Sequence, residues 1–253
     1  MNIDELRNLL QNPLAECVIS QINDLDKRSR FRAYNAVRFL HWSLETAPIS
    51  PNVSAFCALH ATEEAVAAVI SSAKQFGYAS LASRVNLKDH RHKAIVTSYA
   101  SLISNALVRD FKMAIAVLPN KKDLAIRLNR QGSHEPSVLT LHFLRFNEEK
   151  GVLPHQSAAN FFIGAFPNEK EMLAHIKKRQ GIRNDNLYAT QKGIPTGPVE
   201  LEEMLRDEIK LTLGIIWATI DIQKNKDSPA PIVAQVLGGV DFIANIIGKR
   251  TTK

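Results

Sequence analysis

Most apolar positions of this sequence recur every three to four residues, which is the spacing of an amphipathic helix. Between Asp4 and Asn23, leucine, valine and isoleucine follow this spacing, and Pro13 inside the run predicts a kink or a break. The same spacing predicts further helices over 31–44, 53–77, 87–108, 169–180, 199–224 and 232–248. The chain is therefore predicted to be mainly α, with its helices packed as a bundle.

The pattern changes in the middle of the chain. The runs FKMAIAVLP, DLAIRLNR and SVLTLHFLRF contain the alternating positions and short apolar stretches that are typical of strands. Breaker residues separate the runs, at Pro119 and Asn120 and again between Gly132 and Pro136. We therefore expect a small antiparallel β-sheet, at about 111–146, inserted between the helices of a single domain that spans 1–253.

The composition is that of a globular protein with a core, because 45% of the residues are hydrophobic and 23% are charged. No stretch approaches the roughly 18 apolar residues of a membrane-spanning helix, and the N-terminus does not have the pattern of a signal peptide. The two cysteines, Cys17 and Cys57, lie in apolar helical patterns and are predicted to be buried thiols. Together these features predict a cytoplasmic protein with no membrane partner.

The net charge is +7, from 32 basic and 25 acidic residues. A basic protein attracts polyanions, because neutralising phosphates releases their counterions. The charge therefore favours a nucleic acid such as RNA as the partner.

A first polar segment, His60 with Glu63 and Glu64, interrupts the apolar pattern of the helix predicted over 53–77. A carboxylate on a buried helix face needs a partner, because an unpaired buried charge is costly. Two interpretations remain open: a structural pairing with a Lys or Arg of a neighbouring helix, or a functional site.

A second polar segment runs from Asp89 to Lys93 and contains His90 and His92. Alternate histidines suggest a metal, but no cysteine or third histidine lies at a matching spacing. The pattern instead favours a solvated helix start with Asp89 near the N-terminus. We expect no metal and no cofactor.

A third polar segment, from Arg183 to Tyr188, is predicted to lie in a loop that precedes a long helix. Arginine binds phosphate through two parallel hydrogen bonds, so an exposed arginine among polar amides suits a phosphate. The alternative is a turn whose arginine caps a nearby helix.

Four short pieces in this order, AYNAVRFL with Asn35, FCALHATEEAVAAVI, KDHRHKAI with Lys93, and IRNDNLYA, resemble the HEPN superfamily, specifically its abortive-infection V group. The resemblance covers three of the predicted helices and the late loop, about half of the chain. The strands at 111–146 are not part of it.

The resemblance implies a HEPN-like helical bundle that acts in antiphage defence as an abortive-infection toxin. Its activity would be that of a metal-independent endoribonuclease, or of an inhibitor directed at RNA or translation. Arg183 matches the family arginine that stabilises phosphate charge, and Asn184 matches the polar residue that orients it. Glu63 or Glu64 would support Arg183. The protein would act as a homodimer on RNA, with an antitoxin or a phage protein as a further partner.

Tyr188 stands where active members of the superfamily usually carry histidine. A tyrosine with an ordinary pKa near 10 is a poor base at neutral pH. Either Tyr188 only positions the RNA, or the protein does not cut RNA, or another histidine transfers the proton. The candidate histidines are His60, His90, His92 and His175.

Two other classes of function remain open, and enzymatic activity is therefore uncertain from the sequence. The first is a non-catalytic HEPN-like module that binds RNA, a nucleotide or a protein. The second is a purely structural interaction protein, which would leave the polar loop unexplained.

Overall fold

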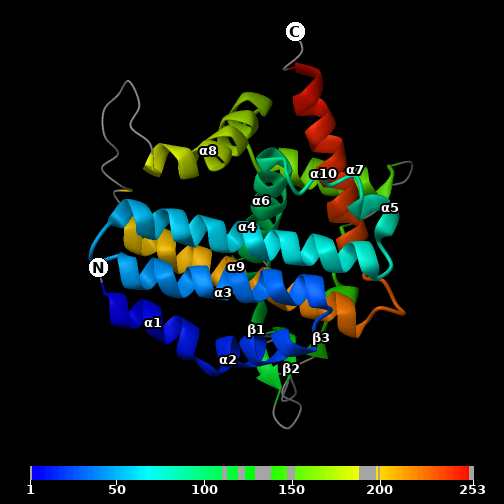
Figure 1. The fold of residues 1–253 in the computed structure, drawn as a ribbon. Coiled ribbons are helices and arrows are strands. Elements are labelled where there is room, and N and C mark those ends of the chain that lie inside the picture. Colours follow the sequence, from blue (N-terminus) through cyan, green and yellow to red (C-terminus); the bar gives the residue numbers. More distant parts are fainter. Residues whose placement is uncertain are drawn as a thin grey trace.

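The computed structural model describes residues 2–109, 113–118, 123–128, 138–146, 152–187, 198 and 200–250 (Figure 1). The prediction of a mainly helical protein is confirmed. The helices of this part of the chain are α1 (Ile3–Gln11), α2 (Pro13–Ser20), α3 (Lys27–Thr46), α4 (Pro51–Gln75), α5 (Ala79–Ala82), α6 (His90–Arg109), α7 (Pro154–Gly164), α8 (Glu169–Leu187), α9 (Leu201–Lys224) and α10 (Pro231–Arg250). Two short 3-10 helices are η1 (Gln21–Asp24) and η2 (Leu141–Phe143).

Helix α4 is the centre of the bundle and packs against both α3 and α9 (Figure 1). Its buried face is rich in alanine, which lets neighbouring helices approach closely and costs little side-chain entropy. The buried apolar residues form one core cluster, to which helices from α1 to α10 contribute. The bundle is therefore organised around a helix that the sequence marks by its small side chains.

The N-terminal region consists of two helices rather than one kinked helix. Helix α1 ends at Gln11, and Asn12 is extended. The side chain of Asn12 accepts hydrogen bonds from the backbone amides of Leu14 and Ala15, and Pro13 occupies the first turn of α2. Proline is favoured at this position because its missing amide would be unpaired there in any case. Of the kink and the break that Pro13 predicts, the structure shows the break.

Helix α8 extends beyond its predicted end. It starts as expected, with Asn168 Oδ1 accepting a hydrogen bond from the amide of Glu171. It then continues through Gly181 to Leu187, so the predicted loop over 183–187 is wrong. Glycine disfavours a helix by only about 1 kcal/mol relative to alanine, which a long helix tolerates.

The segment between α6 and α7 contains three strands, β1 (Met113–Leu118), β2 (Asp123–Leu128) and β3 (Val138–Leu139). They pair antiparallel in the order β1-β2-β3, with Ile115 opposite Ile126. Strand β1 contacts α2 and α6. The third predicted strand is only two residues long and is followed by η2, so the expected extension of strand structure to Phe146 is wrong.

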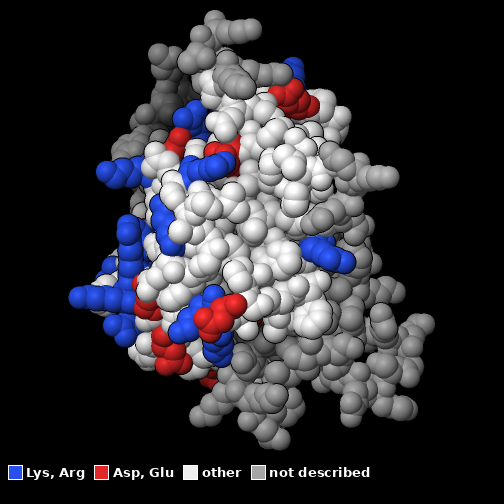
Figure 2. Space-filling view, turned by 90° about the vertical axis from the view of Figure 1, so that its right-hand side faces the viewer, with Lys and Arg blue, Asp and Glu red and all other residues white. Residues whose placement is uncertain are grey.

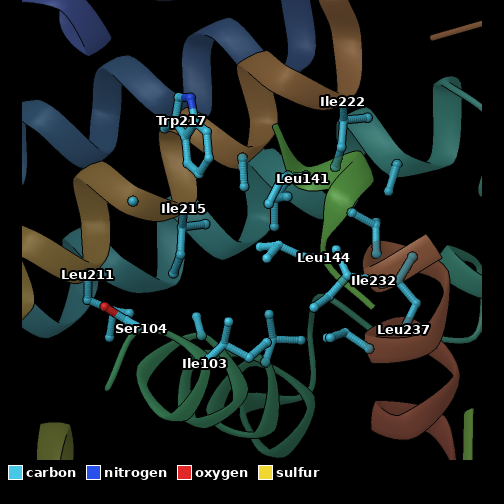
Figure 3. A pocket seen from close by; sticks show the side chains of 18 of the residues that line it. Ile103, Ser104, Leu141, Leu144, Leu211, Ile215, Trp217, Ile222, Ile232 and Leu237 are labelled. Atoms are coloured by element: carbon cyan, nitrogen blue, oxygen red, sulfur yellow. The ribbon is translucent and has the colours of Figure 1, made fainter. Parts of the chain in front are cut away.

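A cavity of about 200 Å³ lies between α4, α6, α9, α10 and η2 (Figure 3). Its walls are almost wholly apolar, and they include Ile103 on α6, Ile215 and Trp217 on α9 and Leu237 on α10. Gly214 also lines it, and a Cβ atom at this position would meet no other atom within 4 Å. The bundle is therefore underpacked along one face of α9.

Two of the described helices, Pro51–Gln75 and Pro231–Gly248, are long and apolar enough to cross a membrane by length and composition. The expectation that no segment approaches this limit is therefore wrong. The first of these is the central helix of the bundle, and 67% of its most apolar window is buried, whereas 39% of the corresponding window of the second is buried. A helix that is buried on all sides is apolar on all sides, because none of its faces contacts water.

Both cysteines are buried, as predicted. Burial also raises the pKa of the Cys57 thiol. A raised pKa leaves little thiolate, the reactive form, at neutral pH.

Candidate functional site

Three of the predicted supporting residues meet where α4 faces the start of α6. Glu63 on α4 lies with Oε1 3.2 Å from Nδ1 of His90 and with Oε2 3.3 Å from Nζ of Lys93. Each carboxylate oxygen therefore has its own partner on α6. Among the described residues, Glu63, His90 and Lys93 are thus the predicted supporting residues that the fold brings together.

The start of α6 places the two partners of Glu63 on one face. Asp89 Oδ1 accepts a hydrogen bond from the backbone amide of Arg91, 2.8 Å away, so the predicted role of Asp89 at the helix N-terminus is confirmed. His90 and Lys93 are three residues apart on this helix, a spacing that puts side chains on the same side. The local sequence thus fixes where the imidazole and the ammonium lie.

The Glu63 carboxyl group is ionised more readily than an ordinary glutamate. Burial opposes its ionisation, since only 18% of the side chain is exposed, but the charges and hydrogen bonds of Lys93 and His90 outweigh burial and lower its pKa. A carboxylate can only accept hydrogen bonds, so it favours the His90 tautomer with a proton on Nδ1. The lone pair of that tautomer is on Nε2.

A second ion pair borders the first. Arg179 on α8 places Nη2 2.6 Å from Oε1 of Glu208 on α9. The hydroxyl of Thr62 donates to the other oxygen of Glu208 and lies 2.9 Å from the hydroxyl of Thr212. Glu208 is buried, so this pair joins α4, α8 and α9 through a carboxylate that is satisfied on both oxygens.

The sequence prediction did not include Arg179 and Glu208. One signal was available for Glu208, because it precedes Ile209 within the apolar stripe of α9, where an acidic residue requires a partner. The identity of that partner was not available from the sequence. Arg179 is one of several cations on α8 and has no distinguishing spacing.

The two ion pairs lie around a pocket of about 20 Å³, which is roughly the space of one water molecule. Glu63, His90 and Arg179 line it, together with Thr62 and Thr97. Beside it, the carboxylates of Glu63 and Glu208 balance the charges of Lys93 and Arg179. A phosphate group is larger than this space and would therefore contact the rim, where the His90 side chain is 36% exposed.

Another histidine lies one turn before Arg179 on α8. Nε2 of His175 is 3.1 Å from the hydroxyl of Ser98 on α6. Burial, with smaller contributions from Arg179 and Lys178, lowers the pKa of His175. His175 is therefore predominantly neutral near pH 7.

His92 is held differently from His90. Its Nδ1 accepts a hydrogen bond from the backbone amide of Asn86, and burial lowers its pKa. No group of three or more His, Cys, Asp or Glu side chains suited to a metal occurs among the described residues.

The remaining supporting residues lie outside this pocket. His60 contacts the rings of Phe39 and Phe56, at centroid distances of 4.4 and 5.7 Å. Asn35 on α3 accepts a hydrogen bond from Arg38. Glu64 is half-buried on α4 and does not line the pocket.

The backbone of Arg183 and Asn184 belongs to α8, but their side chains lie outside the described part of the structure. Tyr188 lies outside the described residues altogether. Their predicted roles as catalytic residues therefore stay predictions. The structure gives Glu63 two partners on α6 and places a different arginine, Arg179, beside it.

Comparison with known proteins does not assign the chain to a family. No family model matches it, and no solved structure matches it. A segment of 130 residues is 24% identical to elongation factor Ts of Pseudothermotoga lettingae. The match covers 51% of this chain and 58% of that protein, so the chain spans little more than half of its curated relative.

Proposed function

We propose that this chain is a HEPN-like, RNA-directed protein of the abortive-infection kind, and that it is a metal-independent endoribonuclease in which His90 transfers the proton. The hydrogen bond between Glu63 and His90 is the observation that carries the proposal. A carboxylate that holds a partly exposed imidazole in one tautomer is a recurrent arrangement for general-base catalysis.

In this mechanism, neutral His90 accepts the proton of a ribose 2′-hydroxyl through Nε2. The 2′ oxygen forms a bond to the adjacent phosphorus, and the bond from phosphorus to the 5′ oxygen breaks. The departing 5′ oxygen takes up a proton from water. The products are a 2′,3′-cyclic phosphate and a 5′-hydroxyl end.

Positive charge near the reacting phosphate comes from several groups in the proposal. Protonated His90 is cationic and still paired with Glu63, and Arg179 lies across the pocket. Arg183 and Asn184, on the following turn of α8, are the residues that match the HEPN motif. Cations placed where charge develops are worth most in a site that excludes water.

The protein's context follows from the same resemblance. We place the protein in the cytoplasm, as a homodimer that presents two sites to one RNA, with Tyr188 contacting the scissile region. An antitoxin or a phage protein would control its activity. No cofactor is required by this chemistry.

A second candidate is a non-catalytic HEPN-like module that binds RNA, a nucleotide or a protein. One observation favours it: the two carboxylates already balance Lys93 and Arg179, and the pocket is small. Such a network also serves to lock α4, α6, α8 and α9 together without catalysis.

Induced expression of the wild type, His90→Gln and Arg183→Ala, with total RNA and growth followed from early times, separates the two candidates. We expect growth arrest with discrete RNA fragments that end in 2′,3′-cyclic phosphates, and loss of both effects in each variant. His41→Gln, an exposed histidine on α3, is the matched control and should behave as the wild type. Cleavage that survives in His90→Gln would overturn the catalytic role of His90, and intact RNA with the wild type would favour the binding module.

A further inference from the structure

A continuous line of basic and aromatic side chains follows the exposed side of α3. We call it the α3 stripe; its members are Lys27, Phe31, Tyr34, Arg38 and Trp42. They are separated by four, three, four and four residues, which keeps them on one helical face. All five side chains are exposed.

The α3 stripe lies on a basic part of the described surface. Helix α3 carries five basic residues and a single acidic one, Glu45. Lys and Arg side chains crowd the left-hand edge of Figure 2, which is the front of the molecule in Figure 1, where α3 and α4 lie. The centre of the view in Figure 2 carries few charges. The charge of this region therefore suits a polyanion.

The aromatic rings distinguish the stripe from an ordinary solvated helix face. Phe31 is 58% exposed and Trp42 is 40% exposed, although both would gain free energy from burial. The guanidinium of Arg38 lies 4.8 Å from the centre of the Trp42 ring, and that of Arg30 lies 5.8 Å from the Phe31 ring. Each ring is thus paired with a cation at the surface.

Local hydrogen bonds fix this arrangement before any ligand binds. Asn35 accepts a hydrogen bond from Nη2 of Arg38, and the hydroxyl of Tyr34 donates to Oδ1 of Asn23 at 2.6 Å. Side chains that are already ordered lose less entropy on binding. Asn35, singled out by the sequence resemblance, thereby acts through Arg38.

We infer that the α3 stripe binds single-stranded RNA, with bases stacked on Phe31 and Trp42 and phosphates paired with Lys27 and Arg38. Unpaired bases offer flat faces to aromatic rings, whereas the bases of a duplex are already stacked on each other. A duplex would use the cations and leave the rings without a role.

Ring contacts lead from the stripe to α4, one turn before Glu63. The Phe39 ring lies 5.0 Å from that of Trp42 and 4.4 Å from that of His60. His60 precedes Glu63 by three residues on α4. As a substrate path, this continuity rests on the proposed nuclease function; as a binding surface, the stripe can be tested without it.

The test is fluorescence anisotropy with a short labelled 2′-O-methyl oligouridine, which lacks the 2′-hydroxyl and cannot be cleaved. We expect Phe31→Ala and Trp42→Ala each to raise the Kd by roughly 5- to 150-fold, corresponding to the loss of one stacked base. We expect Arg38→Gln to weaken binding and to reduce the slope of log Kd against log salt concentration by about 0.7.

The controls are Phe143→Ala, which removes an exposed ring outside α3, and Arg84→Gln, which removes an exposed arginine on another surface. Both should bind as the wild type. Thermal melting of each variant checks that the fold is intact. Binding of the oligouridine by a wild-type protein that leaves cellular RNA intact would contradict only the nuclease proposal.

Two results would overturn the inference. One is a Kd that the Phe31 and Trp42 substitutions leave unchanged. The other is a wild-type protein that does not bind the oligouridine but binds vesicles of phosphatidylglycerol. A basic helix with exposed aromatic rings also suits an anionic membrane.

Discussion

At the scale of single residues, Glu63 shows how a pattern in the sequence gains meaning from its neighbours. An acidic residue on an apolar helix face predicted a partner, and Lys93 of the neighbouring helix α6 is such a partner. The same carboxylate also holds His90, which the sequence had placed at a solvated helix start. One residue therefore joins two segments that had been considered separately.

Replacing Glu63 with glutamine should lower the free energy of unfolding by about 1–2 kcal/mol at pH 7, because a charged hydrogen-bond acceptor is lost from a largely buried position. Folding lowers the pKa of Glu63, so the ionised carboxylate stabilises the native state. That contribution is complete above the ordinary pKa of 4.5 and is lost as pH falls through the lower, folded value.

Urea unfolding of the wild type and Glu63→Gln from pH 7 to pH 3 measures this effect. The difference between the two proteins should shrink only in the acidic range. Glu203→Gln, on the exposed side of α9, is the control and should change stability by less than about 0.5 kcal/mol. A difference that stays constant across the whole range would show that Glu63 is not stabilised as a carboxylate.

At the scale of secondary-structure elements, Gly214 of α9 and Gly239 of α10 occupy opposite environments. Gly214 lies in α9 beside the apolar cavity of Figure 3 and has open space around it. A Cβ atom at Gly239 in α10 would collide with the hydroxyl of Tyr99 and lie 3.3 Å from Cβ of Ala158. Glycine is therefore required at Gly239, where helices touch. At Gly214, where they do not touch, glycine only lowers the stability of the helix.

Gly214→Ala should therefore stabilise the protein by about 0.5–1 kcal/mol, since alanine restricts the unfolded chain and favours the helix. Gly239→Ala should destabilise it by about 1–3 kcal/mol, because the new methyl group overpacks the contact with Tyr99. Thermal or denaturant unfolding of the two variants is the measurement. Equal effects at both positions would contradict the packing described for α9 and α10.

At the scale of the whole molecule, charge and assembly bear most directly on function. Part of the net charge of +7 lies on α3, which contains five basic residues and one acidic residue. The proposed nuclease requires two such molecules, because HEPN sites are shared across a symmetric dimer. Cyclic symmetry would then give both copies the same self-complementary contact surface.

We expect the protein to sediment as a dimer at micromolar concentration, and we expect added salt to weaken RNA binding without dissociating the dimer. Analytical ultracentrifugation at low and moderate ionic strength checks both statements. A monomer throughout the micromolar range would exclude a cleft shared by two copies. The α3 stripe would be unaffected by that result, since it lies within one chain.

Much of the fold could be predicted from local patterns. Most helices lie close to their predicted positions, because apolar spacing and capping residues such as Asn168 act over only a few residues, but no range was predicted for α7. The errors occur at proline and glycine, each of which can either interrupt a helix or be accommodated within one. Pro13 begins a helix instead of bending one, and Gly181 is tolerated within α8.

The sequence by itself determined the helical class, the burial of both cysteines and the basic, aromatic composition of α3, since each depends on residue type and short-range spacing. Only the tertiary structure decided that Glu63 meets His90 and Lys93, and that Glu208 is paired with Arg179. Glu63 and Lys93 are 30 positions apart, and Glu208 and Arg179 are 29 apart. Such pairings depend on how whole helices pack, and no local pattern encodes them.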